Sequence, residues 1–191
     1  GNTVEQFRSS FPESWIHAFE PFDESFTIMK NRFQKMDRVF FNNVAIGNSV
    51  AESDSFYVTK NEGSSSLLKP RRGANRFWKD TPLLIQKKVR VRLKTIDKYC
   101  EERNINKIDI LKLDVQGSEI KVLNGASRML SEKNIKLIFT EISIASSYKD
   151  QSEIDEIISL LRAYDYRIFN FFKMKHLKGK LIECDVLFYA E

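Results

Sequence analysis

The fold class is decided by one stretch of the sequence, Ile108-Asp109-Ile110-Leu111-Lys112-Leu113-Asp114-Val115-Gln116-Gly117-Ser118-Glu119-Ile120. Its first six residues are largely apolar, which is typical of a buried strand. Gly117 then predicts a turn, and Ser118 opens a helix. This strand, turn and helix place Asp114 at the carboxyl end of the strand, where open α/β sheets bind their ligands.

Helices and strands alternate on both sides of this stretch. The apolar spacing and the turn residues before this stretch predict a helix from Thr3, a strand over 15–19, a helix with Phe26, Met29, Phe33 and Met36 on one face, and strands over 39–44 and 56–59. A strand over 88–94, at a sheet edge or over the loop region, and a helix capped by Thr95 follow. After the central strand we predict a helix from Ser118, a second short helix up to Leu130, a strand over 135–142, a helix over 154–161 with a Ser152 cap, and antiparallel strands over 166–172 and 182–189. This order predicts an α/β fold with a mostly parallel, doubly wound sheet, helices on both faces and a C-terminal antiparallel hairpin.

Length and composition fit one domain over 1–191. The chain has 191 residues, of which 42% are hydrophobic and 30% charged. Residues 60–86 are polar and predict a long loop or lid. The sequence contains no apolar run near the about 18 residues of a membrane helix and no visible signal peptide. Two isolated cysteines, Cys100 and Cys184, favour a reduced, cytoplasmic protein.

Acidic residues follow or end three predicted strands. Glu20 follows the strand over 15–19, Asp114 follows the central strand, and Glu141 repeats the pattern. Gly1-Asn2-Thr3 opens the first helix about 20 positions before Glu20, a spacing typical of sites that hold a ribose through its hydroxyls. A row of acids matches a cationic, hydroxyl-rich ligand or a divalent cation. No His and Cys spacing indicates a metal centre.

Other polar residues have structural explanations as well as functional ones. Glu119 stands in the first turn of its helix, where its charge favours the helix dipole. Asp114 is harder to explain structurally, because a carboxylate after a buried strand needs a partner or a ligand. His17 lies inside a predicted strand and is more typical of a core histidine than of a base.

Several motifs together resemble the FkbM-type methyltransferases. The similarity is carried by Leu93-Lys94-Thr95-Ile96-Asp97, by the stretch from Ile108 to Glu119, by Val122-Leu123-Asn124-Gly125-Ala126, by His17-Ala18-Phe19-Glu20-Pro21, by Asn43-Val44-Ala45-Ile46-Gly47, by Gly63-Ser64-Ser65-Ser66-Leu67, by Phe139-Thr140-Glu141-Ile142 and by Glu183-Cys184-Asp185-Val186-Leu187-Phe188. The resemblance implies a Rossmann-like fold and methylation, dependent on S-adenosylmethionine (AdoMet), of a hydroxyl on a small-molecule or glycan acceptor.

The resemblance also implies roles for individual residues. Gly1, Asn2 and Thr3 belong to the cofactor loop, and Glu20 with Pro21 belongs to the ribose site. Val44 and Ala45 lie beside the adenine, while Ser64, Ser65 and Ser66 form a loop near the substrate. Asp114 lines the methionine end and the acceptor pocket, and either Asp114 or Glu119 is the candidate base.

Two departures from the family pattern have consequences. Gln116 stands where a glutamate is common, so no acid role is expected there. The family's first strand, normally between the strands that end at Glu20 and Asp114, and most of its glycine-rich loop would precede Gly1. We therefore expect these 191 residues to bind AdoMet weakly or not at all.

Two other functions compete with this one. The basic stretch over 87–94 favours an RNA-binding protein or RNA methyltransferase, although exposed aromatic residues that stack on bases are missing from it. A dehydrogenase-like nucleotide enzyme is the other alternative, and the segment from Asp114 to Glu119 argues against it. The sequence leaves the oligomeric state open.

Overall fold

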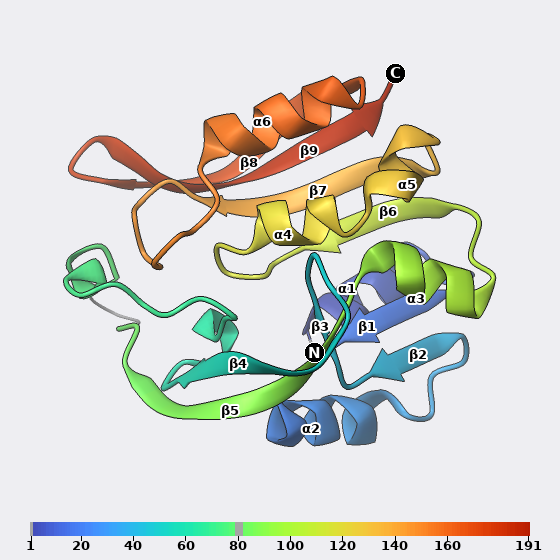
Figure 1. Ribbon diagram of the computed structural model, residues 1–191, viewed down its shortest axis with the longest axis horizontal. Coiled ribbons are helices and arrows are strands. Elements are labelled where there is room, and N and C mark those ends of the chain that lie inside the picture. Colours follow the sequence, from blue (N-terminus) through green and yellow to red (C-terminus); the bar gives the residue numbers. More distant parts are fainter. Residues whose placement is uncertain (1, 79–81) are drawn as a thin grey trace.

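A computed structural model of the chain describes residues 2–78 and 82–191 (Figure 1). The helices are α1 (Asn2–Ser10), α2 (Asp23–Phe33), α3 (Ile96–Arg103), α4 (Glu119–Asn124), α5 (Ser127–Ser131) and α6 (Ile154–Ala163). The strands are β1 (Ile16–Phe19), β2 (Val39–Asn42), β3 (Ala45–Ile46), β4 (Ala51–Thr59), β5 (Ile85–Lys94), β6 (Ile108–Leu113), β7 (Ile135–Ser143), β8 (Tyr166–Leu177) and β9 (Lys180–Ala190). Two short 3₁₀ helices, Glu62–Ser64 and Ala74–Arg76, lie in the long connection before β5.

The strands form three sheets within the described residues, where the sequence predicts one continuous sheet. β1 pairs with β2 in parallel, β3, β5 and β4 form a mixed sheet, and the order of the third sheet is β6-β7-β9-β8. In the third sheet β6 and β7 are parallel, and the predicted C-terminal hairpin β8–β9 is antiparallel. The first and third sheets meet through side chains, because Phe19 of β1 packs against the core beside β6.

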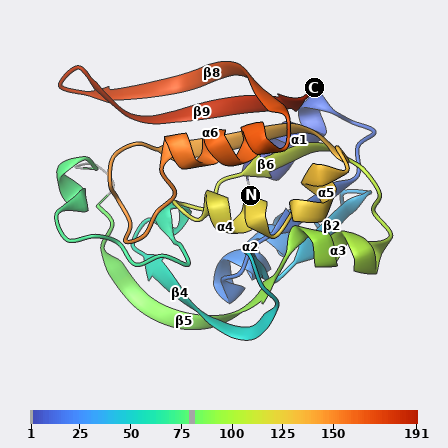
Figure 2. The same ribbon diagram turned by 45° about the horizontal axis from the view of Figure 1, so that its top comes forward.

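The main core lies between the four-stranded sheet and a layer of helices. Helices α3, α5, α4 and α6 contact one another in that order and cover one face of the sheet (Figures 1 and 2). Alternate side chains of β7 and β9 point into this layer, and Ile138, Ile142, Val186 and Phe188 are at most 1% exposed. The intervening residues point to the opposite face. That alternation places Glu141 on the face away from the core.

The parallel pair β1–β2 is covered on both faces. Ala18 and Phe41 pack against α1 and α2, whereas Phe19 contacts Tyr99 of α3. Helix α2 ends at Phe33, earlier than the predicted apolar face implied. Met36 still packs in this cluster, but from the turn that follows the helix.

Three other element boundaries differ from the sequence prediction. The strand predicted over 39–44 ends at Asn42, because its partner β1 ends at Phe19, opposite Asn42. Strand β4 begins at Ala51, well before residue 56, since it pairs with β5. The cap of α6 is Glu153 in a reciprocal capping box with Glu156, and the predicted cap, Ser152, is not used.

Strand β5 lies between β3 and β4, although β3 pairs only with its last two residues. Three of its five basic side chains have hydrogen-bonding or ion-pair partners within the protein. Lys87 pairs with Glu24, Lys94 pairs with Glu102, and Arg92 donates to the carbonyl of Asn43. These contacts account for much of the charge that the sequence concentrates over 87–94.

Strand β8 is the outer strand of its sheet and is irregular. Its pairing with β9 shifts register between Ile168 and Asn170 and again between Phe172 and Lys175. Lys173, within the second irregularity, has a φ of 45° in the left-handed region. Phe169 and Met174 are among its exposed side chains.

Helix ends near the central motif are fixed by side chains. Thr95 caps α3 as predicted, accepting from the backbone N–H of Lys98. Asp97 performs a similar task for α5, whose own N-cap residue makes no side-chain hydrogen bond. The two carboxylate oxygens of Asp97 accept from the backbone N–H groups of Arg128 and Met129, at 2.8 and 3.1 Å.

We expect Asp97→Ala to lower the free energy of unfolding by about 1–2 kcal/mol, the usual cost of a lost helix cap. Urea unfolding followed by circular dichroism measures it. Asp109→Ala is the control, because Asp109 makes only an exposed ion pair with Lys136. Its expected effect stays within about 0.5 kcal/mol. Equal losses in both variants would contradict the capping role.

Candidate active site

The carboxyl end of β6 carries a connected group of polar side chains. Asp114 follows the strand directly, as the sequence predicts. The side-chain amide of Gln116 donates to Asp114 Oδ1 and to Glu141 Oε1, each at 2.9 Å. The structure therefore brings Asp114 and Glu141 together. Glu141 lies inside β7, which continues to Ser143, and not at the end of its strand as the sequence predicts.

The turn after Asp114 depends on two left-handed residues. Gln116 has a φ of 53° and Gly117 a φ of 94°. A Cβ at Gly117 would lie 3.0 Å from Cβ of Gln151, so both its conformation and its surroundings favour glycine. The carbonyl of Gly117 accepts from the hydroxyl and the N–H of Ser152. The turn is thus fastened to the segment before α6.

Glu141 stands in an acidic environment. Burial raises the pKa of its carboxyl to about 7, and the nearby charges of Asp114 and Glu183 act in the same direction. Lys112 and the Gln116 amide partly oppose this increase. With a pKa of about 7, the Glu141 carboxyl is only partly ionised near neutral pH. The Asp114 side chain is 46% exposed and faces solvent. Two carboxyl groups with different environments are typical of sites that handle protons.

Glu119, the other candidate base, is 2% exposed. Its Oε1 accepts from the backbone N–H of Gly117 at 3.1 Å, so its carboxyl group supports the turn from within. Burial raises its pKa to about 7, and the charge of Asp114 adds to that effect. This geometry favours the structural explanation of Glu119.

Glu119 also makes stability depend on pH. Its carboxyl holds a proton more tightly in the folded state, where its pKa is about 7, than at its ordinary value of 4.5. Its contribution is therefore complete below about pH 4.5 and is lost as the pH rises through about 7. We expect Glu119→Gln to flatten the decline in unfolding free energy between about pH 4.5 and pH 7.

Urea unfolding at a series of pH values measures this effect. Glu52→Gln removes a carboxyl from an exposed position of β4 and should keep the native slope. A Glu119→Gln variant with the unchanged slope would show that Glu119 does not carry this dependence.

The predicted serine loop contacts this site through its backbone and through one buried side chain. The Ser66 hydroxyl donates to the carbonyl of Gln116 at 2.8 Å, and Ser66 is 1% exposed. The Ser64 carbonyl accepts from the Tyr148 hydroxyl at 2.7 Å, and Ser65 Oγ accepts from the N–H of Thr59. Ser66 therefore attaches the loop to the turn after Asp114, while Ser64 and Ser65 attach it to Tyr148 and to β4.

The rest of the long loop is also attached to the segment after β7. Pro70 forms an isolated antiparallel bridge with Tyr148, and the Trp78 indole N–H donates to Ser147 Oγ at 2.7 Å. A second apolar cluster fills the space between them. Its buried members are Leu68, Ala74, Trp78, Leu83, Ala145, Tyr148 and Ile182.

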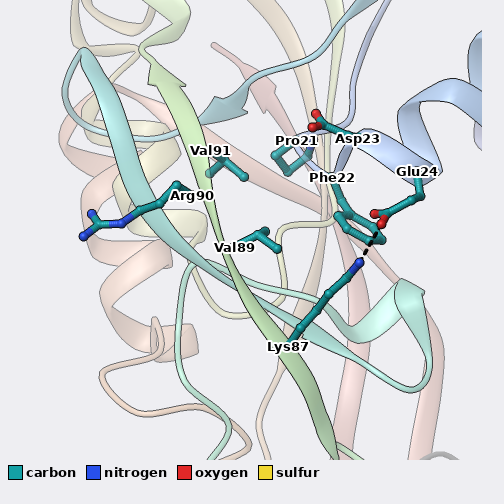
Figure 3. Close-up of a pocket in the computed structure, with 8 residues that line it drawn as sticks. All are labelled: Pro21, Phe22, Asp23, Glu24, Lys87, Val89, Arg90 and Val91. Atoms are coloured by element: carbon teal, nitrogen blue, oxygen red, sulfur yellow. Dashed lines mark hydrogen bonds and ion pairs between the residues drawn. The ribbon is translucent and has the colours of Figure 1, made fainter.

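The predicted ribose residues lie at the carboxyl end of β1. Oε1 of Glu20 accepts from the backbone N–H of Phe22 at 3.0 Å, and its carbonyl accepts from the Asn43 amide. Pro21 lines a pocket of about 110 Å³ between the start of α2 and β5 (Figure 3). In that view Arg90 points away from the other lining residues, and Lys87 reaches Glu24.

The other residues predicted to bind the cofactor lie in different parts of the N-terminal half of the chain. Gly1 lies outside the described residues, and Asn2 and Thr3 belong to α1. Val44 is half-buried just before β3. Ala45 is 5% exposed and packs in an apolar cluster with residues of β4 and β5, so the structure gives it a core position.

His17 is half-buried, and its Nδ1 lies 2.7 Å from the Tyr99 hydroxyl. Burial lowers its pKa, and Arg103 adds to that shift. This agrees with its interpretation as a core histidine. Across the residues that the structure describes, no three His, Cys, Asp or Glu side chains are grouped to hold a metal ion.

Sequence reasoning missed Tyr148. Its ring is 2% exposed, and its hydroxyl lies 3.0 Å from Gln116 Oε1 as well as near Ser64. Burial raises its pKa, as do the charges of Glu119 and Glu141. Tyr148 lies in an irregular segment whose sequence has neither helical nor strand periodicity. Its aromatic character, a few residues after the predicted strand over 135–142, was the only signal.

Comparison with known proteins gives the following relationships. The sequence profile described as the methyltransferase FkbM domain matches residues 1–168. The chain is 24% identical over 175 residues to 2-O-methyltransferase NoeI of Sinorhizobium fredii (strain NBRC 101917 / NGR234). That alignment covers 86% of this chain and 68% of the relative. No solved structure matches. None of the described helices has the length and apolar character needed to cross a bilayer.

Proposed function

Since the chain belongs to the FkbM methyltransferase family, we propose that it transfers a methyl group from AdoMet to a hydroxyl of a sugar, glycan or secondary metabolite. The single observation that carries this proposal is the partly exposed Asp114 at the carboxyl end of β6, joined to Glu141 through Gln116. The similarity to a 2-O-methyltransferase supports a hydroxyl acceptor.

The proposed role of Asp114 is to orient the acceptor hydroxyl and to accept its proton. An ionised carboxylate offers only acceptor oxygens, which suits both tasks. Lys112 Nζ lies 3.9 Å from Asp114 Oδ2 at the same end of β6. Glu119 is too deeply buried to compete for the acceptor, so we assign the base role to Asp114 and a supporting role to Glu119.

The residues of the β1 end fit the nucleoside part of AdoMet in their chemistry. Glu20 follows the strand, and its carboxylate is an acceptor-only group suited to ribose hydroxyls. Pro21 and Phe22 stand at the adjacent pocket. When bound, AdoMet would supply a methyl group activated by its positive sulfonium. The protein's part is to hold the acceptor oxygen in line with it.

Several observations support a small acceptor over a nucleic acid. The basic residues Lys87, Arg92 and Lys94 of β5 already pair within the chain. Nucleic-acid affinity depends mainly on basic groups available to phosphates.

Both cysteines are buried free thiols, which supports the proposed reducing, cytoplasmic compartment.

Calorimetric titration with S-adenosylhomocysteine tests the cofactor assignment. In the full-length gene product we expect Glu20→Gln to weaken binding about 10-fold or more, because a charged acceptor of ribose hydroxyls is lost. Glu52→Gln, a matched change at an exposed position, should bind as the native protein does. Native affinity in Glu20→Gln would remove Glu20 from the ribose site.

A further inference from the structure

Gln116 occupies the centre of the site and contacts three functional groups at once. Its Nε2 donates to Asp114 Oδ1 and Glu141 Oε1, while its Oε1 accepts from the Tyr148 hydroxyl at 3.0 Å. This orientation suits the chemistry of the partners. Carboxylate oxygens accept hydrogen bonds and face the amide nitrogen, while the tyrosine hydroxyl can donate and faces the amide oxygen.

We propose that Gln116 is a positioning residue, which holds the carboxyl groups of Asp114 and Glu141 side by side toward the acceptor and is itself oriented by Tyr148. The inference rests on the proposed function, because it assigns both carboxyl groups to one acceptor site. It adds Glu141 to that site and gives Gln116 and Tyr148 roles that act through the two acids.

The backbone of Gln116 is held as firmly as its side chain. Its φ of 53° lies in the left-handed region, which glycine adopts more readily than glutamine. Its carbonyl accepts from the buried Ser66 hydroxyl at 2.8 Å. The side-chain bonds to Asp114, Glu141 and Tyr148 compensate for this strained backbone.

Tyr148 is fixed independently of Gln116. Its backbone N–H donates to Gln151 Oε1 at 3.0 Å, and Pro70 forms a bridge with it on the other side. Its hydroxyl proton is shared between the carbonyl of Ser64 at 2.7 Å and Oε1 of Gln116. A side chain fixed in this way can set the orientation of the amide that it contacts.

The charges around Glu141 come from all the neighbouring strands. Asp114 and Lys112 face it from β6 and the turn that follows. Glu183 and the buried Asp185 face it from β9, where Asp185 is its cross-strand neighbour. Lys173 reaches Asp185 from β8. The Gln116 amide is the neutral donor among these groups, and its hydrogen bond favours the ionised form of Glu141.

The test is a pH titration of the Glu141 carboxyl carbon by NMR, with the signal assigned from its absence in Glu141→Gln. Gln116→Met keeps the side-chain length but removes both donated hydrogen bonds. We expect Glu141 to titrate at higher pH in this variant. Gln116→Gly is the second variant, because glycine accepts the left-handed backbone, and it should shift the midpoint in the same direction.

A double-mutant cycle tests the role of Tyr148. Tyr148→Phe should raise the titration midpoint of Glu141 in the native background and leave it unchanged in the Gln116→Met background. Tyr166→Phe is the control. It removes an equally buried hydroxyl that donates to the carbonyl of Ile135, and it should leave the Glu141 midpoint in place.

An unmoved midpoint in both Gln116 variants would overturn the proposal. So would an equal effect of Tyr148→Phe in the two backgrounds, because Tyr148 would then act without Gln116. The titration needs neither AdoMet nor an acceptor. A negative result therefore does not affect the methyltransferase proposal. That proposal is tested separately, by the activity and binding measurements.

Discussion

Gly125→Ala is expected to lower the free energy of unfolding by about 3 kcal/mol or more. Gly125 ends α4 with a φ of −75°, so the alanine backbone itself is not strained. The cost comes from space. A Cβ at this position would lie 2.0 Å from the carbonyl oxygen of Gly47 and 3.2 Å from Cβ of Thr95. The obstacle is backbone, which cannot rotate away, so α4 and the end of β3 must move apart.

Urea unfolding followed by tryptophan fluorescence measures this loss. Gly63→Ala is the matched control, because its Cβ would meet only Asn61 Oδ1 at 3.6 Å. We expect that variant to stay within about 0.5 kcal/mol of the native protein. A Gly125→Ala variant as stable as Gly63→Ala would mean that the helix and strand are not held at this distance.

Asp114→Asn is expected to lower kcat for methyl transfer about 100-fold or more, which is the lower range for loss of a general base. Asparagine keeps the shape of the side chain and a hydrogen-bond acceptor, but it cannot take up a proton at neutral pH. The measurement is release of S-adenosylhomocysteine by the full-length gene product with a panel of mono- and oligosaccharides as acceptors.

Asp109→Asn provides the control for this experiment. Asp109 belongs to the same strand, β6, but its side chain is 79% exposed and pairs with Lys136. Its kcat should equal that of the native protein. If Asp114→Asn keeps native activity, another group accepts the proton, and the assignment of Asp114 fails. Unfolding curves of both variants separate a chemical effect from a loss of structure.

The sequence predicted those features that depend on local pattern. The strand before Asp114, the Gly117 turn, the Thr95 cap and the C-terminal hairpin are each specified by neighbouring residues, and the structure contains them. The division into three sheets could not be read in this way. It depends on which strand edges pair, and alternation along the chain does not determine that.

The candidate site was predicted only in part, because some of its contacts join residues that are far apart in the sequence. The position of Asp114 follows from one strand and one turn. The contacts of Gln116 with Glu141 and Tyr148 join residues that lie 25 and 32 positions apart. Asp97 similarly caps a helix about 30 positions along the chain. Such contacts depend on how elements pack, and no spacing rule encodes them.

The irregular outer strand β8 also affects how molecules of this protein meet one another. A straight, exposed strand offers a continuous row of backbone groups to which another molecule can add. In β8 the register shifts and the left-handed Lys173 interrupt that row. The protein can therefore expose Phe169 and Met174 on this strand without offering a template for edge-to-edge aggregation.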